Sequence, residues 1–392
     1  MARQDQSSRP DSPAIKLSLT SGLIGLILCG FICTQQLTGQ TRSGKRTAST
    51  PAKGAQPKPT PTSTRLKTLG APPPVPVLKK KEEEIKPGDV ISVNTSEVML
   101  PVTVRDSSGR LVKDLTRRDF RVFEDGREQP LSDLALRQVP VDIVLMVDSS
   151  SSVTSNLDDF RRAVEGFATR LAPEDRISLI KFDDRVELLQ DWTQSKYQLH
   201  RALNRIQAGM FTRFNDALLL AAREQFVSAK SRRAVIVLTD GIDSGRGTTA
   251  FESALQGLLQ AQVTVYVVSN TEIERAAKKA ELDSMAQGTE SELRFNEIKI
   301  NDLREGLRVI DLSEERLEQL TTATGGRLYK PKSFDALDAT YAEVADELRH
   351  QYSLYYTPLN RKRDGSFRRV MVETDPTAYR ASTRVGYFAP HD

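Results

Sequence analysis

Cysteine, histidine and tryptophan are scarce in this sequence. Its 392 residues include 2 cysteines, 3 histidines and 1 tryptophan. Both cysteines, Cys29 and Cys33, lie in one apolar run near the N-terminus, so the rest of the chain has none. A disulfide framework and a cysteine-based metal or catalytic site are therefore excluded from the body of the protein.

Several signatures of enzymes are also missing. The sequence contains no G-x-S-x-G turn, which exposes the nucleophilic serine of many hydrolases. It also lacks an H-E-x-x-H metal motif and a glycine-rich phosphate loop. Of the three histidines, His200 and His350 fall on predicted helices and His391 lies at the extreme C-terminus. We therefore expect no enzyme, although a Ser–His–Asp site is recognised by geometry, so a serine hydrolase remains the enzymatic alternative.

The part of the chain after residue 88 is not basic, although the formal net charge of the whole chain is +4. Residues 1–88 hold 14 Lys and Arg against 5 Asp and Glu, whereas the remaining residues hold 42 against 47. The mildly acidic body argues against nucleic-acid binding. Hydrophobic residues make up 38% and charged residues 28% of the chain, which is typical of a globular protein with a buried core.

Residues 1–40 predict export. The apolar run Leu17–Cys33 follows Arg3, Arg9 and Lys16, which is the pattern of an export signal. The run is also close to the roughly 20 residues that a helix needs to span a bilayer. A cleaved signal peptide and an uncleaved membrane anchor both stay open. In either case the positive leader stays in the cytoplasm, so we expect a periplasmic, cell-surface or secreted protein.

Two segments of different character follow. Residues 41–88 are dominated by Pro, Thr, Lys and Ser with few large apolar residues, so they predict a disordered, extended spacer. Residues 89–138 contain short runs of Val, Leu and Phe that are broken at the turn signals 106–109 (DSSG) and 124–126 (EDG). This pattern predicts a small β-rich module.

Residues 139–350 alternate between apolar strands and amphipathic helices. This alternation predicts a doubly wound, Rossmann-like and mainly parallel sheet, which binds ligands at the carboxyl ends of its strands. The predicted strands are 141–148, 176–183, 185–192 (a hairpin partner of the preceding one), 233–241 and 263–270, and the predicted helices are 157–171, 195–206, 215–228, 249–261, 313–323 and 334–349.

Oxygen-bearing side chains follow these strands. Asp148 and Asp240 each close a core strand, so their carboxylates face one pocket if the strands are neighbours. Ser150 and Ser152 are two residues apart, which places both hydroxyls on one side of an extended loop. Thr212 lies in a third polar stretch, just before a helix. Hydroxyl and carboxylate oxygens suit Mg²⁺ better than zinc.

The sequence DSSSS beginning at Asp148 resembles the D-x-S-x-S motif of von Willebrand factor type A (VWA) domains, and the resemblance covers about 141–350. Thr212 and Asp240 match the other positions of that family's metal-dependent adhesion site. The resemblance implies Mg²⁺ (or Mn²⁺) held by Asp148, the two serines and Thr212, with Asp240 acting through water. It implies that an Asp or Glu of a partner protein completes the metal shell. The family usually has glycine where Phe211 stands.

The segments flanking this domain resemble a bacterial exported subgroup of the family, in which 89–138 and 351–392 pair into one all-β module. Asp183, Asp216 and Asp243 are expected near the metal in supporting roles. The connection 271–312 is longer than usual and leaves the metal-bearing face, so we expect it either to shape the partner surface or to form a solvated, charged helix pair. A structural envelope subunit with a degenerate metal site is the alternative function.

Overall fold

The computed structural model of the chain describes residues 97–136, 139–150, 157–207, 209–226, 231–243, 247–375 and 377–391. They belong to one folded unit, Glu84–Asp392. The predicted export segment and spacer, and Ser152, lie outside these residues. Within the described ranges, no helix combines the length and the hydropathy that a membrane crossing requires.

The central element is a six-stranded sheet with the order β10-β9-β8-β5-β6-β7. All neighbours are parallel except β6 and β7, which form the predicted antiparallel hairpin. Every residue of β5 is buried, as expected for a strand covered on both faces. The strands are β5 (Val141–Asp148), β6 (Arg176–Phe182), β7 (Val186–Thr193), β8 (Arg232–Thr239), β9 (Thr264–Ser269) and β10 (Arg327–Tyr329).

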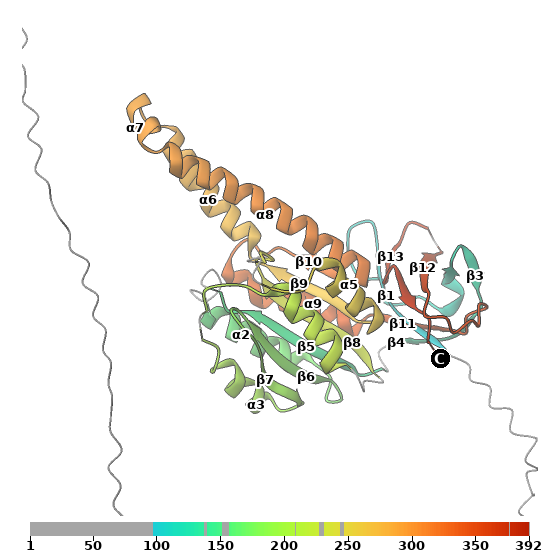
Figure 1. Cartoon of the computed structure of the whole chain (residues 1–392). Coiled ribbons are helices and arrows are strands. Elements are labelled where there is room, and N and C mark those ends of the chain that lie inside the picture. Colours follow the sequence, from blue (N-terminus) through green and yellow to red (C-terminus); the bar gives the residue numbers. More distant parts are fainter. Residues whose placement is uncertain are drawn as a thin grey trace, which may run out of the picture. The chain divides into compact units, whose positions relative to one another are not determined.

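Helices cover both faces of this sheet (Figure 1). Helices α2, α3 and α9 bury apolar residues against one face, and α4, α5 and the end of α8 against the other. The predicted doubly wound fold is therefore confirmed. The helices are α2 (Leu157–Arg170), α3 (Lys196–Leu203), α4 (Phe214–Leu220), the π-helical turn η2 (Ala221–Gln225), α5 (Phe251–Gln260), the short η3 (Phe334–Ala336) and α9 (Leu337–Arg349).

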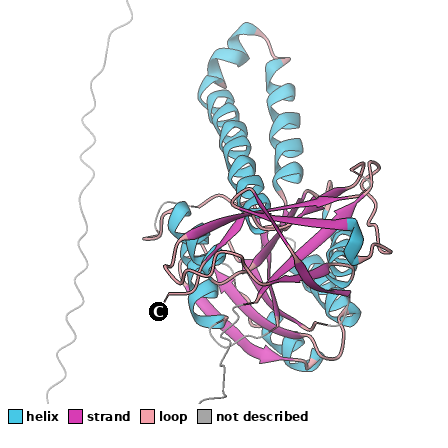
Figure 2. Cartoon of the chain, turned by 90° about the vertical axis from the view of Figure 1, so that its right-hand side faces the viewer, coloured by secondary structure: helices cyan, strands magenta, loops and turns pink. Residues whose placement is uncertain are grey.

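The long connection after β9 is a helical hairpin that projects from the domain (Figure 2). It comprises α6 (Thr271–Ala286), α7 (Glu290–Phe295) and α8 (Glu297–Thr324). The predicted helix 313–323 is thus only the last part of a 28-residue helix. The prediction started too late because the hairpin segment buries few apolar residues.

The predicted all-β module consists of two four-stranded antiparallel sheets, β13-β1-β11-β4 and β14-β12-β2-β3. Strands from the two ends of the described chain pair directly, because β1 pairs with β11 and β12 pairs with β2. The bounds are β1 (Val98–Arg105), η1 (Arg117–Asp119), β2 (Phe120–Glu124), β3 (Arg127–Gln129), β4 (Leu131–Leu136), β11 (Tyr352–Tyr356), β12 (Phe367–Thr374), β13 (Arg380–Ser382) and β14 (Gly386–Phe388).

A buried acid joins this module to the α/β domain. Glu347 on α9 is 2% exposed and forms an ion pair with Arg105 of β1. It also accepts hydrogen bonds from Thr103 at 3.2 Å and from Tyr329 of β10 at 2.8 Å. The C-terminal end of α9 is therefore fixed to both parts of the unit.

Candidate metal centre

The two aspartates of the predicted site lie at adjacent strand ends. Strands β5 and β8 pair in parallel, with Val147 opposite Leu238. Asp148 is the last residue of β5, and Asp240 directly follows β8. Asp148 is fully buried and Asp240 is 6% exposed. The register therefore brings both carboxyl groups to one edge of the sheet, the carboxyl edge of the parallel strands.

Hydrogen bonds fix the Asp148 carboxylate. Its Oδ1 accepts a bond of 2.9 Å from the Ser150 N–H, and its Oδ2 accepts a bond of 2.7 Å from the Thr239 hydroxyl. The first contact is an Asx turn, which reverses the chain directly after the strand. Ser150 is 7% exposed and lies beside the carboxylate that it contacts. The local sequence thus forms a rigid turn in which the acid and the hydroxyl stay together.

The turn after Asp240 is packed against α8. Asp240 Oδ1 accepts a 2.9 Å hydrogen bond from the Ile242 N–H, and its carbonyl oxygen accepts one of 2.6 Å from Ser313. Gly241 has φ +73°, and a Cβ there would lie 2.6 Å from side-chain atoms of both Ser313 and Leu317. Glycine is required here by both the backbone conformation and the space.

The electrostatics of the pair favour a cation. Burial and, second, the charge of the neighbouring Asp240 raise the pKa of Asp148 to about 7, although hydrogen bonds from Ser150 and Thr239 oppose the rise. Both effects disfavour the ionised carboxylate. A bound cation would reverse this balance, because it compensates the charge that burial penalises.

The third loop approaches the same edge. The Gly209 N–H donates to the Ser149 carbonyl at 2.8 Å, and a Cβ at Gly209 would lie 2.4 Å from the Cβ of Asp183. Thr212 is buried at 4% exposure, and Phe211 beside it is half-buried. The close contact of this loop with Ser149 and Asp183 is therefore made at Gly209. The family usually has its glycine two residues later, at the position of Phe211.

The three aspartates that were predicted to support the site hydrogen-bond to neighbouring residues and loops. Asp183 accepts hydrogen bonds from Ser149 at 2.8 Å and from Lys181 at 2.6 Å. Burial opposes ionisation of Asp183, but these bonds outweigh it and lower its pKa. Asp216 accepts bonds from the N–H groups of Thr248 and Thr249, and Asp243 accepts one from the Asn215 N–H at 3.1 Å.

Two residues that the sequence prediction missed stand beside Asp240. Thr239 and Ser269 are paired across β8 and β9, so Asp240 and Asn270 leave the sheet side by side. Asn270 is 3% exposed and donates a 3.1 Å hydrogen bond to Glu274 on the first turns of α6. Burial and the charge of Asp240 raise the pKa of Glu274. The polar residue ending the strand 263–270 was the signal in the sequence.

The available ligands suit a hard cation. The predicted ligands Asp148, Asp240, Ser150 and Thr212 carry carboxylate and hydroxyl oxygens, which Mg²⁺ prefers together with water. In the part of the chain that the structure describes, no three His, Cys, Asp or Glu side chains converge as a metal cluster.

The fold and the candidate site define an α/β domain with buried carboxyl and hydroxyl side chains at the carboxyl edge of its sheet. Residues 142–307 match the family model of the von Willebrand factor type A domain. The chain contains a VWA domain, as the D-x-S-x-S resemblance indicated.

Similar proteins cover only parts of the chain. The uncharacterized protein sll0103 of Synechocystis is 28% identical over 109 residues, which are 27% of this chain and 26% of that protein. The chain therefore spans about a quarter of the length of this curated relative. It spans about half of the first two solved structures described below.

Three solved structures are similar to parts of this chain. A VWA protein from Catenulispora acidiphila is 14% identical, with 58% of this chain and 49% of that chain covered and a TM-score of 0.39. The mussel byssus protein PTMP1 with a zinc-occupied MIDAS motif is 20% identical, with 57% and 49% covered and a TM-score of 0.38. An aerotolerance-related membrane protein from Bacteroides fragilis is 16% identical, with 53% and 99% covered and a TM-score of 0.36.

Proposed function

We propose that this chain binds a partner protein through Mg²⁺ (or Mn²⁺) held at the carboxyl edge of the sheet. The observation that carries the proposal is the buried pair Asp148 and Asp240 on adjacent strand ends. Two buried carboxylates that disfavour each other's ionisation are stabilised by a divalent cation. No base is needed beside the serines, because the proposed reaction is binding and not catalysis.

The residues of the predicted site have different roles in this proposal. Asp148, Ser150, Ser152 and Thr212 would hold the metal, and Asp240 would act through water. The bound metal supplies an open coordination position for an Asp or Glu of the partner. The Asx turn at Asp148 and the Gly209 contact keep two of the three loops in place before the partner arrives.

The helical hairpin supports a role as the partner surface. Its α8 contacts the metal loop through the Ser313 bond to the Asp240 carbonyl, and its α6 carries Glu274 beside Asp240. Further along the hairpin, Phe295 is 89% and Ile298 is 78% exposed. Exposed aromatic and aliphatic side chains of this kind are enriched at the centres of protein interfaces, so the far end of the hairpin offers a second contact for the partner.

The test is a crosslinking pull-down with the full chain in Mg²⁺ or in EDTA. We expect partner capture that EDTA and Asp148→Ala both abolish, while Asp158→Ala at the exposed start of α2 keeps it. Capture that is equal in EDTA, or that survives Asp148→Ala, would contradict metal-dependent binding. Without stabilisation of the wild-type fold by Mg²⁺, the alternative of a degenerate site would be favoured.

A second variant tests the hairpin. A Cβ at Gly306 would lie 3.3 Å from Lys278, so α6 and α8 are adjacent there and a short Gly-Ser linker can replace 279–305. The shortened chain keeps the ion pair of Arg275 with Glu314 at 2.9 Å. We expect unchanged Mg²⁺ binding and lost partner capture. Unchanged capture would show that the hairpin is not part of the partner surface.

The proposed location is outside the cytoplasm, because the positive leader and apolar run of residues 1–40 predict export. Protease added to intact cells should degrade the folded unit if it is exposed at the cell surface, and after opening of the outer envelope if it is periplasmic. Protection until the cytoplasmic membrane is lysed would contradict export.

A further inference from the structure

A second polar site lies in the β-module, beside a cavity of about 270 Å³. Gln262, which also lines this cavity, precedes β9, so the cavity is on the amino-edge side of the main sheet, opposite the metal centre. Four of the lining residues are basic, namely Arg361, Lys362, Arg363 and Arg368, and one, Glu97, is acidic. The first three belong to the loop between β11 and β12 and are exposed.

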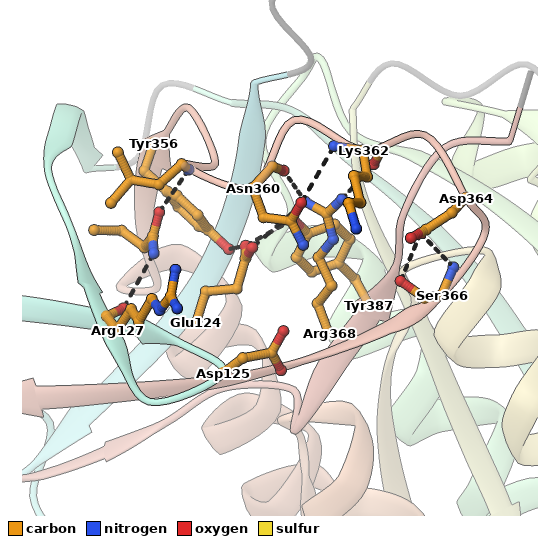
Figure 3. A network of polar contacts seen from close by, with 12 residues as sticks. Glu124, Asp125, Arg127, Tyr356, Asn360, Lys362, Asp364, Ser366, Arg368 and Tyr387 are labelled. Atoms are coloured by element: carbon orange, nitrogen blue, oxygen red, sulfur yellow. Dashed lines mark hydrogen bonds and ion pairs between the residues drawn. The ribbon is translucent and has the colours of Figure 1, made fainter.

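A buried charge network stands behind this loop (Figure 3). Glu124 and Arg368 are each 2% exposed and approach to 3.4 Å. Glu124 also accepts hydrogen bonds of 2.8 Å from the hydroxyls of Tyr356 and Tyr387. Burial, with the Glu124 contact, raises the pKa of Tyr387 to about 12, so the hydroxyl remains a donor at neutral pH.

Arg368 anchors the backbone of the basic loop. Its guanidinium donates to the carbonyl oxygen of Asn360 at 2.5 Å and to that of Lys362. The loop that carries three consecutive cations is therefore anchored through its backbone to a buried ion pair. A binding loop that is fixed before the ligand arrives loses less conformational entropy on binding.

Some positively charged side chains of this site lack an acidic or hydrogen-bonding partner within the described part of the protein. Among the described residues, the side chains of Arg361 and Lys362 form no ion pair, and the buried Nε of Arg368 has no hydrogen-bond partner. An oxyanion in the adjoining cavity would offset the mutual repulsion of the loop cations.

We propose that this cavity binds a phosphoryl group, presented by a small phosphate compound or by the headgroup of an anionic lipid. Guanidinium groups match the geometry of phosphate oxygens, and Lys adds a point charge. The volume is just below the range of about 300–1,000 Å³ typical of small-molecule sites, so it suits a headgroup-sized ligand. Tyr387 and Phe388 line the same cavity and offer an apolar wall to the rest of that ligand.

The test is calorimetric titration of the full chain with inorganic phosphate and with glycerol 3-phosphate. We expect saturable binding that weakens at least tenfold in Arg361→Gln/Lys362→Gln. The matched variant Lys279→Gln/Lys332→Gln removes the same charge from exposed positions elsewhere and should bind like the wild type. Binding that is absent in the wild type, or equally weakened in both variants, would overturn the proposal.

A competition arm separates the two sources. Vesicles of phosphatidylglycerol and of phosphatidylcholine are added to the chain before the glycerol 3-phosphate titration. The N-terminal apolar run can insert into either kind of vesicle. Only the difference between the two vesicles in blocking the titration therefore reports on binding of the headgroup. A lipid source predicts that phosphatidylglycerol alone blocks the titration, and a free phosphate compound predicts that neither does. Blocking by both vesicles to the same extent would contradict a site that selects an anionic headgroup, because phosphatidylcholine carries a phosphodiester but no net charge.

Discussion

The substitution Asp148→Asn should stabilise the metal-free chain at neutral pH. The rise of the Asp148 pKa from 3.8 to about 7 means that ionising this buried group costs on the order of 4 kcal/mol, at about 1.4 kcal/mol per pKa unit. Asparagine removes the charge but keeps the shape. It loses one acceptor, since the amide nitrogen cannot accept the Thr239 hydroxyl, which costs about 1 kcal/mol. The expected net gain is about 3 kcal/mol in EDTA.

The pH dependence gives the sign of the effect. Because the folded-state pKa of Asp148 lies above its unfolded value, the folded chain keeps a proton that the unfolded chain releases. The wild-type free energy of unfolding in EDTA should therefore fall between about pH 4 and pH 7, and Asp148→Asn should lack this part of the fall. Above pH 7 the difference between the two proteins should be constant.

The assay is urea unfolding in EDTA and in Mg²⁺ at several pH values. Mg²⁺ at one hundred times its dissociation constant should stabilise the wild type by about 2.7 kcal/mol and should not stabilise the variant. Asp158→Asn is the matched control, because Asp158 is an 88% exposed carboxylate. If Asp148→Asn is less stable than the wild type in EDTA at pH 8, by an amount independent of pH, the electrostatic reasoning is refuted.

Three further outcomes are expected. Gly209→Ala should weaken Mg²⁺ binding in calorimetry without unfolding the chain, because the added Cβ would meet Asp183 at 2.4 Å and push the third loop away; equal affinity would contradict this role for Gly209. Glu274→Gln should weaken Mg²⁺ binding a few-fold, since it removes a negative charge beside Asp240; a tighter site would be the opposite result. Glu347→Ala should lower the free energy of unfolding by about 3 kcal/mol, because it leaves Arg105 without its buried partner; a loss below about 1 kcal/mol, the size of an exposed pair, would show that the junction is not stabilising.

The periodic parts of the fold were predictable from the sequence, and the hairpin was not. Continuous apolar runs such as 141–148 are too short for a typical helix and favour a buried strand, and the turn signals at 106–109 and 124–126 mark the β-module. Helix α8 has mostly exposed residues along its first half, with Ile300, Leu303 and Ile310 as widely spaced buried positions. A helix stabilised mainly by one partner helix and by ion pairs gives a weak periodic signal.

Those residues of the candidate site that lie at the ends of strands could be predicted from the sequence. A parallel sheet brings the residues after β5 and β8 together, so Asp148 and Asp240 followed from topology alone. Asn270 follows β9 by the same rule, but an asparagine before a helix also reads as an ordinary cap. Gly209 and Ser313 act through close tertiary contacts, which no local pattern in the sequence records.

The architecture determines which elements can respond to an event at the metal centre. The loop after β8 contacts α8, through Ser313 on Asp240 and Leu317 against Gly241. Helix α9 packs on the other face of the sheet, and its end is fixed by Glu347 to Arg105 and by its Leu348 carbonyl to Arg232 at 2.8 Å. Sliding α9 along its axis would break these buried contacts, whereas α6 buries only Thr271 and the first half of α8 buries few residues. Helix α8 therefore links Asp240 both to the hairpin and, through the 2.9 Å hydrogen bond from the Val385 N–H to the Ala323 carbonyl oxygen, to the β-module.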